Sequence, residues 1–188
     1  MKKLLSLLII TLSFSASIFA QSDKKNDKIH WRTIEEVEAL QLKEARKVLV
    51  DVYTVWCGPC KMMMKNTFGN KNVIDYINTH YYAVKFDAES GEDVTFKGNI
   101  YKNPGFNPYG RGRKSQHQLA QALGVRSYPT IIYMDENMEV ITPIKGYLTP
   151  TQIELYLKLF AEKNYEEIGA NKTELDKYFK NFTPKFGK

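Results

Sequence analysis

The sequence predicts an α/β fold, in which a central mixed β-sheet is flanked by helices. The first half of the chain alternates between strand and helix patterns, and the second half holds a long loop followed by a helix, two strands and a helix. Residues 47–55 (KVLVDVYTV) form a nearly continuous apolar and β-branched run, which is typical of a central strand buried on both faces. A length of 188 residues fits one compact domain. We therefore expect parallel strands joined through helices, then a terminal hairpin and helix.

The elements of the first half follow from local signals. Residues 29–31 (IHW) are expected to form a short first strand. Thr33 and Glu36 match a capping box in front of apolar residues at helical spacing, which predicts a helix over 34–46. The remaining elements of this half are a strand over 47–55, helices over 57–68 and 72–80, and a strand over 81–87.

The second half begins with a change of composition. Residues 88–118 hold five of the eleven glycines and two of the seven prolines, which predicts a long loop or a small hairpin. A helix over 115–123 should end at Gly124. The remaining elements are strands over 130–134 and 139–144, a helix that starts at Pro150 and runs to about Lys163, and a last amphipathic helix over 171–182.

The N-terminal residues have the three parts of a secretory signal peptide. Lys2 and Lys3 precede an apolar run from Leu4 to Leu12, and a serine-rich stretch then leads to Ala20. The run is short and polar for a membrane anchor, so cleavage after Ala20 is favoured over retention as an N-terminal anchor. We therefore expect residues 1–20 to be removed and the mature protein to be periplasmic or secreted.

The expected mature chain carries little net charge. Residues 21–28 (QSDKKNDK) show no apolar periodicity and are expected to form a flexible tether. Without the two lysines of the leader, the chain has 25 basic and 21 acidic residues, which gives a net charge of +4. The whole chain is 43% apolar and 26% charged, which excludes disordered and collagen-like proteins.

The chain has two cysteines, Cys57 and Cys60. This number excludes a scaffold held by several disulfides and a four-cysteine zinc site. Zinc would need further ligands, and the three histidines have no metal-like spacing. In an oxidising compartment the pair is either an active redox couple or a structural bridge, and a bridge over two intervening residues would gain little loop entropy. Redox activity is therefore favoured.

The run 56–60 (WCGPC) places reactive groups at the start of a helix. Unpaired amides and the positive end of the helix dipole stabilise a thiolate at Cys57, so its pKa should fall from about 8.5 toward neutrality. Cys60 lies on the same side of the helix and should be less exposed, which makes Cys57 the nucleophile and Cys60 the resolving thiol. Pro59 costs no hydrogen bond at this position, and Gly58 lets a substrate chain come close.

These cysteines belong to a longer pattern between residues 48 and about 160. Its residues are Asp51, the run 56–61 (WCGPCK), Lys85–Asp87 (KFD), Tyr128–Thr130 (YPT) and Gly146. The combination resembles the thioredoxin superfamily. Residues 62–68 (MMMKNTF) lack the proline that kinks the thioredoxin helix, and they are similar to the soluble C-terminal domain of the membrane thiol-reductant transporter and related secreted proteins.

The resemblance implies a thioredoxin fold with an insertion before the strand that follows a cis-proline. The thioredoxin-like domain would cover 29–163, with the insertion at 88–118 and a C-terminal helical extension over 164–188. Pro129 would be cis and lie beside the cysteines, and the backbone of Tyr128 would pair with substrate. Trp56, Gly58 and Pro59 would complete the substrate-binding surface.

The resemblance also implies that Asp51 is a buried carboxyl below the cysteines. Burial raises the pKa of a carboxyl, so Asp51 could pass a proton to or from Cys60 during exchange. Lys85 would neutralise or tune Asp51, and the alternative is an exposed strand lysine.

The implied activity is an extracytoplasmic thiol:disulfide oxidoreductase that reduces protein disulfides by dithiol exchange through Cys57 and Cys60. The Gly58–Pro59 pair resembles that of reducing family members, so a reductase is favoured over a disulfide isomerase or oxidase. We expect disulfide-containing protein substrates and a membrane electron donor, without cofactor or metal. A non-catalytic binding or chaperone module is the alternative from another class.

The 88–118 insertion interleaves aromatic and basic residues, which can indicate nucleic-acid binding. Export and the small net charge argue against a nucleic-acid partner. Two alternatives stay open for the insertion: a lid near the active site that recognises a partner, or a passive surface loop.

Overall fold

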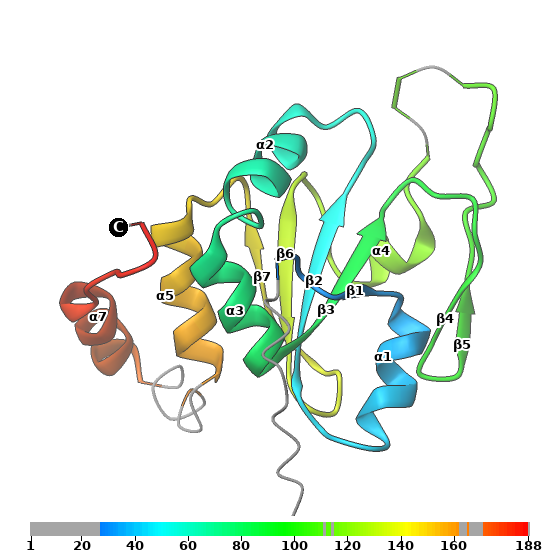
Figure 1. Ribbon diagram of the computed structural model, residues 1–188. Helices are drawn as coiled ribbons and strands as arrows, with labels where there is room; N and C mark the ends of the chain where they lie inside the picture. Colours follow the sequence, from blue (N-terminus) through cyan, green and yellow to red (C-terminus); the bar gives the residue numbers. More distant parts are fainter. Residues whose placement is uncertain (1–26, 111, 114, 162–164, 166–170, 188) are drawn as a thin grey trace, which may run out of the picture.

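The computed structural model describes residues 27–110, 112–113, 115–161, 165 and 171–187 (Figure 1). The predicted signal peptide (1–20), most of the tether and the predicted boundary at 163/164 lie outside these residues, as do Arg111 and Lys114 of the insertion.

The central sheet has five strands in the order β1-β3-β2-β6-β7. Strands β1 and β2 run parallel to β3, β6 is antiparallel to β2, and β7 is antiparallel to β6. The α/β fold with a mixed sheet is therefore confirmed. The strands are β1 (Trp31–Arg32), β2 (Lys47–Tyr53), β3 (Tyr81–Asp87), β6 (Thr130–Met134) and β7 (Val140–Lys145).

Helices cover both faces of this sheet (Figure 1). One core cluster joins side chains of α2, α3 and α5 to one face, and a second cluster joins α1 and α4 to the other. The last helix, α7, lies against α5, where the Tyr178 hydroxyl donates to the Leu155 carbonyl at 3.4 Å. The helices are α1 (Ile34–Gln41), α2 (Gly58–Asn66), α3 (Lys71–His80), α4 (Gln118–Ala122), α5 (Pro150–Ala161) and α7 (Lys172–Asn181).

Strand β2 is buried on both faces, as its apolar run predicts. Val48, Val50 and Val52 belong to the cluster with α1 and α4, whereas Leu49 belongs to the cluster with α2, α3 and α5. Side chains alternate along a strand, so Asp51 lies on the same face as Leu49. The strand thus places one carboxyl on the face of the sheet that α2 covers.

The first helix is shorter than predicted. The expected helix over 34–46 ends at Gln41, with Leu42 as its C-cap. The Gln41 side chain donates to the Arg46 carbonyl at 2.6 Å and accepts from the Arg46 amide at 2.8 Å. These two bonds fold residues 42–46 into a turn that leads to β2, and Leu42 is left 90% exposed.

The insertion contains a small hairpin of strands β4 (Val94–Phe96) and β5 (Asn99–Tyr101). Lys97 and Gly98 connect these strands with φ angles of 51° and 73°, a turn in which glycine avoids strain. Phe96 is buried in the cluster with α1 and α4. Of the two predicted forms of this segment, the structure therefore contains the hairpin, followed by a loop that leads to α4.

The C-terminal segment returns to the core. Phe186 is buried in the cluster with α3 and α5. The fully buried Glu154 of α5 accepts from the amides of Lys185 and Phe186 at 2.6 and 2.8 Å. Burial alone would raise the pKa of Glu154, but the hydrogen bonds from Lys158 and from these two amides outweigh it and lower that pKa below its usual value. An ionised Glu154 therefore binds the backbone of the C-terminal segment at Lys185 and Phe186.

Candidate active site

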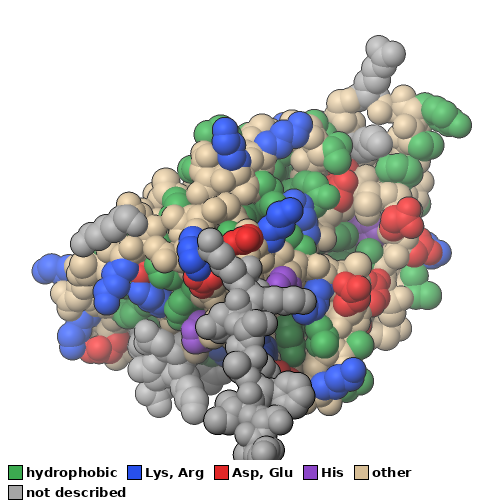
Figure 2. Space-filling model, in the orientation of Figure 1, with side chains coloured by type: hydrophobic (Ala, Val, Ile, Leu, Met, Phe, Trp, Pro, Cys, Tyr) green, Lys and Arg blue, Asp and Glu red, His purple; other side chains and the backbone are tan. Residues whose placement is uncertain are grey.

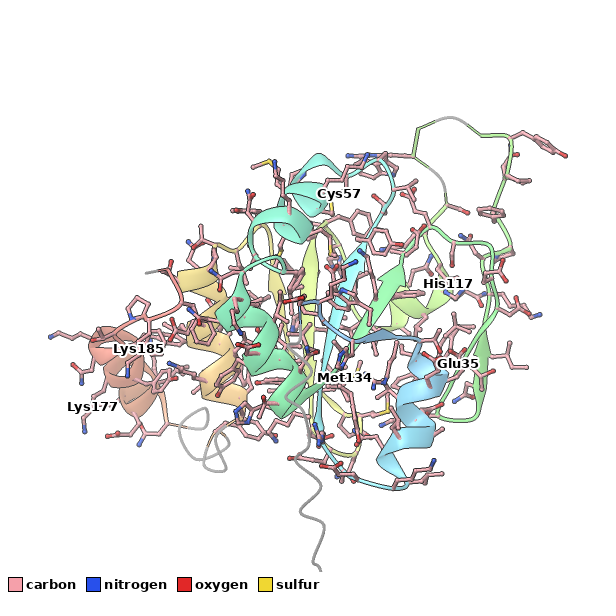
Figure 3. The ribbon with its side chains drawn as sticks, in the orientation of Figure 1. Glu35, Cys57, His117, Met134, Lys177 and Lys185 are labelled. Atoms are coloured by element: carbon pink, nitrogen blue, oxygen red, sulfur yellow. A yellow bond between two sulfur atoms is a disulfide. The ribbon has the colours of Figure 1, made fainter. Side chains whose placement is uncertain are left out.

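Cys57 and Cys60 are joined in a disulfide at the start of α2, beside the carboxyl end of β2 (Figure 3). Cys57 is the N-cap of the helix, and its Sγ accepts the amide of Cys60 at 3.1 Å. Pro59 lies in the first turn, where a missing amide costs nothing. The helix terminus thus directs the amide of Cys60 toward the sulfur of Cys57.

The expected difference in exposure between the two cysteines is not present in this disulfide form. Cys57 is 1% exposed and Cys60 is 4% exposed. The Cys57 sulfur is turned back over the first helical turn, where it meets the Cys60 amide, and the neighbouring Gly58 and Pro59 form the exposed surface instead.

Asp51 is buried, as predicted, with 2% of its surface exposed. Burial raises its pKa to about 7, although the positive charge of Lys85 lowers that pKa in part. Asp51 and Lys85 are register partners in β2 and β3. A carboxyl with this pKa can take up or release a proton near neutral pH.

Lys85 is half-buried, and it is not the exposed strand lysine of the alternative interpretation. Its ammonium lies 4.7 Å from the centre of the Tyr53 ring and 5.7 Å from that of Trp31. Lys85 and Cys60 both line a cavity of about 560 Å³, here called the Cys60 cavity. Its lining residues are Tyr53–Val55, Cys60, Lys61, Met64, Lys65 and Lys85.

The peptide bond between Tyr128 and Pro129 is cis, as the resemblance implies. Pro129 is buried, and its carbonyl accepts the amide of Gly146 at 2.8 Å. The Tyr128 ring meets the Trp56 ring edge to face, with 6.0 Å between their centres. Tyr128 thus reaches the residue that precedes Cys57.

A second depression, of about 580 Å³, is lined by Cys57 and is here called the Cys57 groove. It combines the helix start, the segment before the cis-proline and part of the insertion. Its lining residues are Trp56, Cys57, Pro59, Glu89, Arg113, Gln116 and Val125–Tyr128.

The insertion holds Trp56 in this groove. The Trp56 indole donates to the Glu89 carboxylate at 2.7 Å, and the Arg113 guanidinium lies 4.7 Å from the centre of the indole ring. Gln116 donates to the Tyr128 hydroxyl at 3.1 Å. The insertion is therefore part of the surface beside Cys57.

A family model described as a thioredoxin-like domain matches residues 35–161. This match covers about two thirds of the chain. The chain belongs to the thioredoxin-like family. The cysteine pair in disulfide contact within this domain supports thiol:disulfide oxidoreductase chemistry.

Two curated relatives are similar to this thioredoxin-like chain. It is 23% identical over 131 residues to the thiol:disulfide interchange protein DsbD of Photorhabdus laumondii, a match that covers 69% of the chain and 19% of the relative. It is 29% identical over 110 residues to thioredoxin C-3 of Corynebacterium nephridii, with 58% and 55% covered. The chain thus spans about a fifth and about half of the lengths of these relatives.

Two solved structures share the fold of this thioredoxin-like chain. A thioredoxin-fold protein from Helicobacter pylori superposes with a TM-score of 0.57 at 19% identity, covering 84% of this chain and 93% of the other. A thioredoxin from Thermus thermophilus gives a TM-score of 0.54 at 15% identity, with 76% and 93% covered. The predicted thioredoxin fold is therefore confirmed.

The methionine triplet of α2 does not converge on one point. Met63 is 1% exposed and packs in the core, Met62 is 53% exposed, and Met64 lines the Cys60 cavity.

Within the described residues, no cluster of three or more histidine, cysteine, aspartate or glutamate side chains is arranged to bind a metal ion. The same residues contain no helix with the length and apolar character needed to span a bilayer.

Three groove residues of this thioredoxin-like domain lie outside the sequence pattern. Glu89 lies in the segment expected to be a loop, Gln116 lies in the predicted helix over 115–123, and Arg126 lies between two predicted elements; none carries a local signal of function. The aromatic and basic composition of the insertion was the signal that could direct attention to Arg113.

Proposed function

We propose that this thioredoxin-like oxidoreductase is an extracytoplasmic protein-disulfide reductase. The observation that supports it most is the arrangement of the two cysteines: Cys57 caps α2, and Cys60 lines a cavity next to Lys85, the partner of Asp51. Such a site separates a nucleophile, which the helix terminus activates, from a second thiol that a carboxyl can deprotonate.

In the first step the Cys57 thiolate attacks one sulfur of a substrate disulfide. A bond forms between Cys57 and that sulfur, the substrate disulfide breaks, and the released substrate thiolate takes a proton from solvent. The free amides at the start of α2 stabilise the thiolate before the attack. Trp56, Pro59 and Tyr128 line the groove in which the substrate chain would lie.

In the second step Cys60 resolves the mixed disulfide. Ionised Asp51 accepts the proton of the Cys60 thiol, and the Cys60 thiolate attacks the Cys57 sulfur. The Cys57–Cys60 bond forms, the substrate leaves as a second thiolate, and the substrate has gained two electrons. Asp51 with a pKa of about 7 exchanges this proton readily at neutral pH.

The protein must then receive two electrons from another dithiol. The leader pattern at residues 1–20 supports export to an oxidising compartment, where no pool of small thiols keeps protein cysteines reduced. We therefore propose a membrane dithiol as the donor. The similarity to a protein named DsbD, a thiol:disulfide interchange protein, supports a place in such an exchange chain.

Two measurements test this function. Reduced protein should reduce insulin disulfides, and Cys57→Ser should not; equal rates would refute the enzyme and favour a binding or chaperone module. The reduction potential against glutathione should lie near about −270 mV, the value of thioredoxin, and a value near about −120 mV would indicate an oxidase instead. Mass measurement of the exported protein should give a chain that starts at Gln21.

A further inference from the structure

The insertion is fixed to the domain at its base, although its composition is that of a loop. The fully buried His117 accepts the amide of Leu119 with Nδ1, so its Nε2 carries the proton and donates to the Glu92 carbonyl at 2.9 Å. The Asn103 side chain donates to the carbonyls of Ser90 and Ser115, both at 2.9 Å, and ties the two ends of the loop together.

The hairpin of the insertion is attached to α1 in the same way. The carboxylates of Glu35 and Glu38 accept the amides of Thr95 and Lys97 at 2.8 and 2.7 Å. These bonds and the buried Phe96 hold the insertion on the domain at several points. Figure 1 shows the loop between β5 and α4 extending past the end of the sheet at which α2 begins.

Two positively charged side chains lie at the Cys57 groove, one from the insertion and one from the segment before the cis-proline. Arg113 stacks on Trp56, and Arg126 lines the groove from the segment before the cis-proline. Both arginines are exposed. The acidic residue of the groove, Glu89, is 6% exposed and accepts a hydrogen bond from the Trp56 indole. The charge that an incoming chain meets in this groove is therefore positive.

We propose that the insertion forms the recognition wall of the Cys57 groove, and that Arg113 and Arg126 select protein segments with an acidic residue beside the disulfide cysteine. This inference rests on the proposed function. A planar guanidinium binds a carboxylate through two hydrogen bonds, and Arg113 is held in place on an aromatic ring, so less side-chain freedom is lost on binding. A lysine beside the substrate cysteine would meet like charge.

Two synthetic peptides test this preference. Both close one intramolecular disulfide, and they differ only at the positions flanking the cysteines, which are glutamate in one and lysine in the other. Stopped-flow rates with the reduced protein at low salt should favour the glutamate peptide by about three- to tenfold, and the ratio should shrink at high salt because the charges are exposed.

Charge reversal gives the matched comparison. Arg113→Glu should lower the ratio to one or below, and Arg126→Glu should lower it independently, whereas Lys43→Glu, the same charge change at an exposed turn after α1, should keep the wild-type ratio. Because each rate ratio is measured within one variant, general damage to the site cancels.

Equal rates with both peptides in the wild type would overturn the inference. So would Arg113→Glu and Arg126→Glu variants that change the ratio no more than Lys43→Glu does. Neutral bis(2-hydroxyethyl) disulfide separates the two proposals: if the wild type reduces neither it nor the peptides, the proposed function fails, and the inference fails with it.

Discussion

The two depressions beside the disulfide are built from different parts of the chain. The Cys60 cavity is made by the end of β2, by β3 and by α2, and it is lined by Lys85, the register partner of Asp51. The Cys57 groove draws three of its residues from the insertion. Figure 2 shows basic side chains on the surface over α2. In the proposed mechanism, proton transfer therefore depends on residues of the sheet, whereas substrate recognition depends on the insertion.

The largest effect is expected from removal of the Cys60 thiol, which lines the Cys60 cavity. Cys60→Ser should reduce turnover to background, because the mixed disulfide between Cys57 and substrate can no longer be resolved. Non-reducing electrophoresis of envelope extracts should show covalent adducts that dithiothreitol releases. A double variant that also carries Cys57→Ser is the control and should show none. Adducts in the double variant would contradict the assigned roles.

Replacement of Asp51 should impair resolution and leave the groove intact. Asp51→Asn should slow resolution about a hundredfold at neutral pH, since general acid–base catalysis contributes roughly 10² to 10⁴. In the wild type the resolution rate should rise with pH through about 7, where Asp51 ionises, and this step should be absent in the variant. An unchanged pH profile would exclude Asp51 as the proton acceptor.

The same replacement has a consequence for stability. The pKa of Asp51 is raised in the folded protein from 3.8 to about 7, so folding stability falls as pH rises through this window and is constant above it. The oxidised Asp51→Asn variant should therefore gain up to about 4 kcal/mol relative to the wild type above pH 7, and nothing below about pH 4. Denaturant unfolding at both pH values measures this difference.

On the groove side, Glu89→Ala should have a smaller effect. The Trp56 indole would lose its acceptor, and peptide reduction should slow by about three- to tenfold, the effect of losing a hydrogen bond worth about 1 kcal/mol. Glu89→Gln retains an acceptor oxygen and serves as the matched control. The pH midpoint of resolution should stay near that of the wild type in both variants. A shifted midpoint would mean that the two regions are coupled.

The smallest effect is expected from replacement of Lys85, the register partner of Asp51. Lys85→Gln removes the positive charge that lowers the pKa of Asp51, so that pKa should rise. The midpoint of the resolution profile should move to higher pH, and the rate at pH 7 should fall by less than about tenfold, the factor that one pKa unit represents. A midpoint that moves to lower pH would contradict this arrangement.

The strands around the Cys60 cavity could be predicted from the sequence, because their burial follows strand periodicity. The strands over 81–87 and 130–134 match β3 and β6, and the place of Asp51 in an apolar run indicated its burial. The groove side could not be predicted, since the bond from Trp56 to Glu89 joins residues 33 positions apart and depends on how the insertion folds back. The over-long first helix has a similar cause, because the Gln41 side chain binds the backbone of Arg46.

The chain contains two tryptophans: Trp56 lines the Cys57 groove, and Trp31 lies near Lys85, which lines the Cys60 cavity. The Trp56 ring lies under the Arg113 guanidinium and meets the Tyr128 ring edge to face, whereas the Trp31 ring lies 5.7 Å from the ammonium of Lys85. Indole emission depends on nearby charges and disulfides. In the Trp31→Phe variant the fluorescence of Trp56 would report on the groove, and in the Trp56→Phe variant that of Trp31 would report on the surroundings of Lys85, in both cases without an added label.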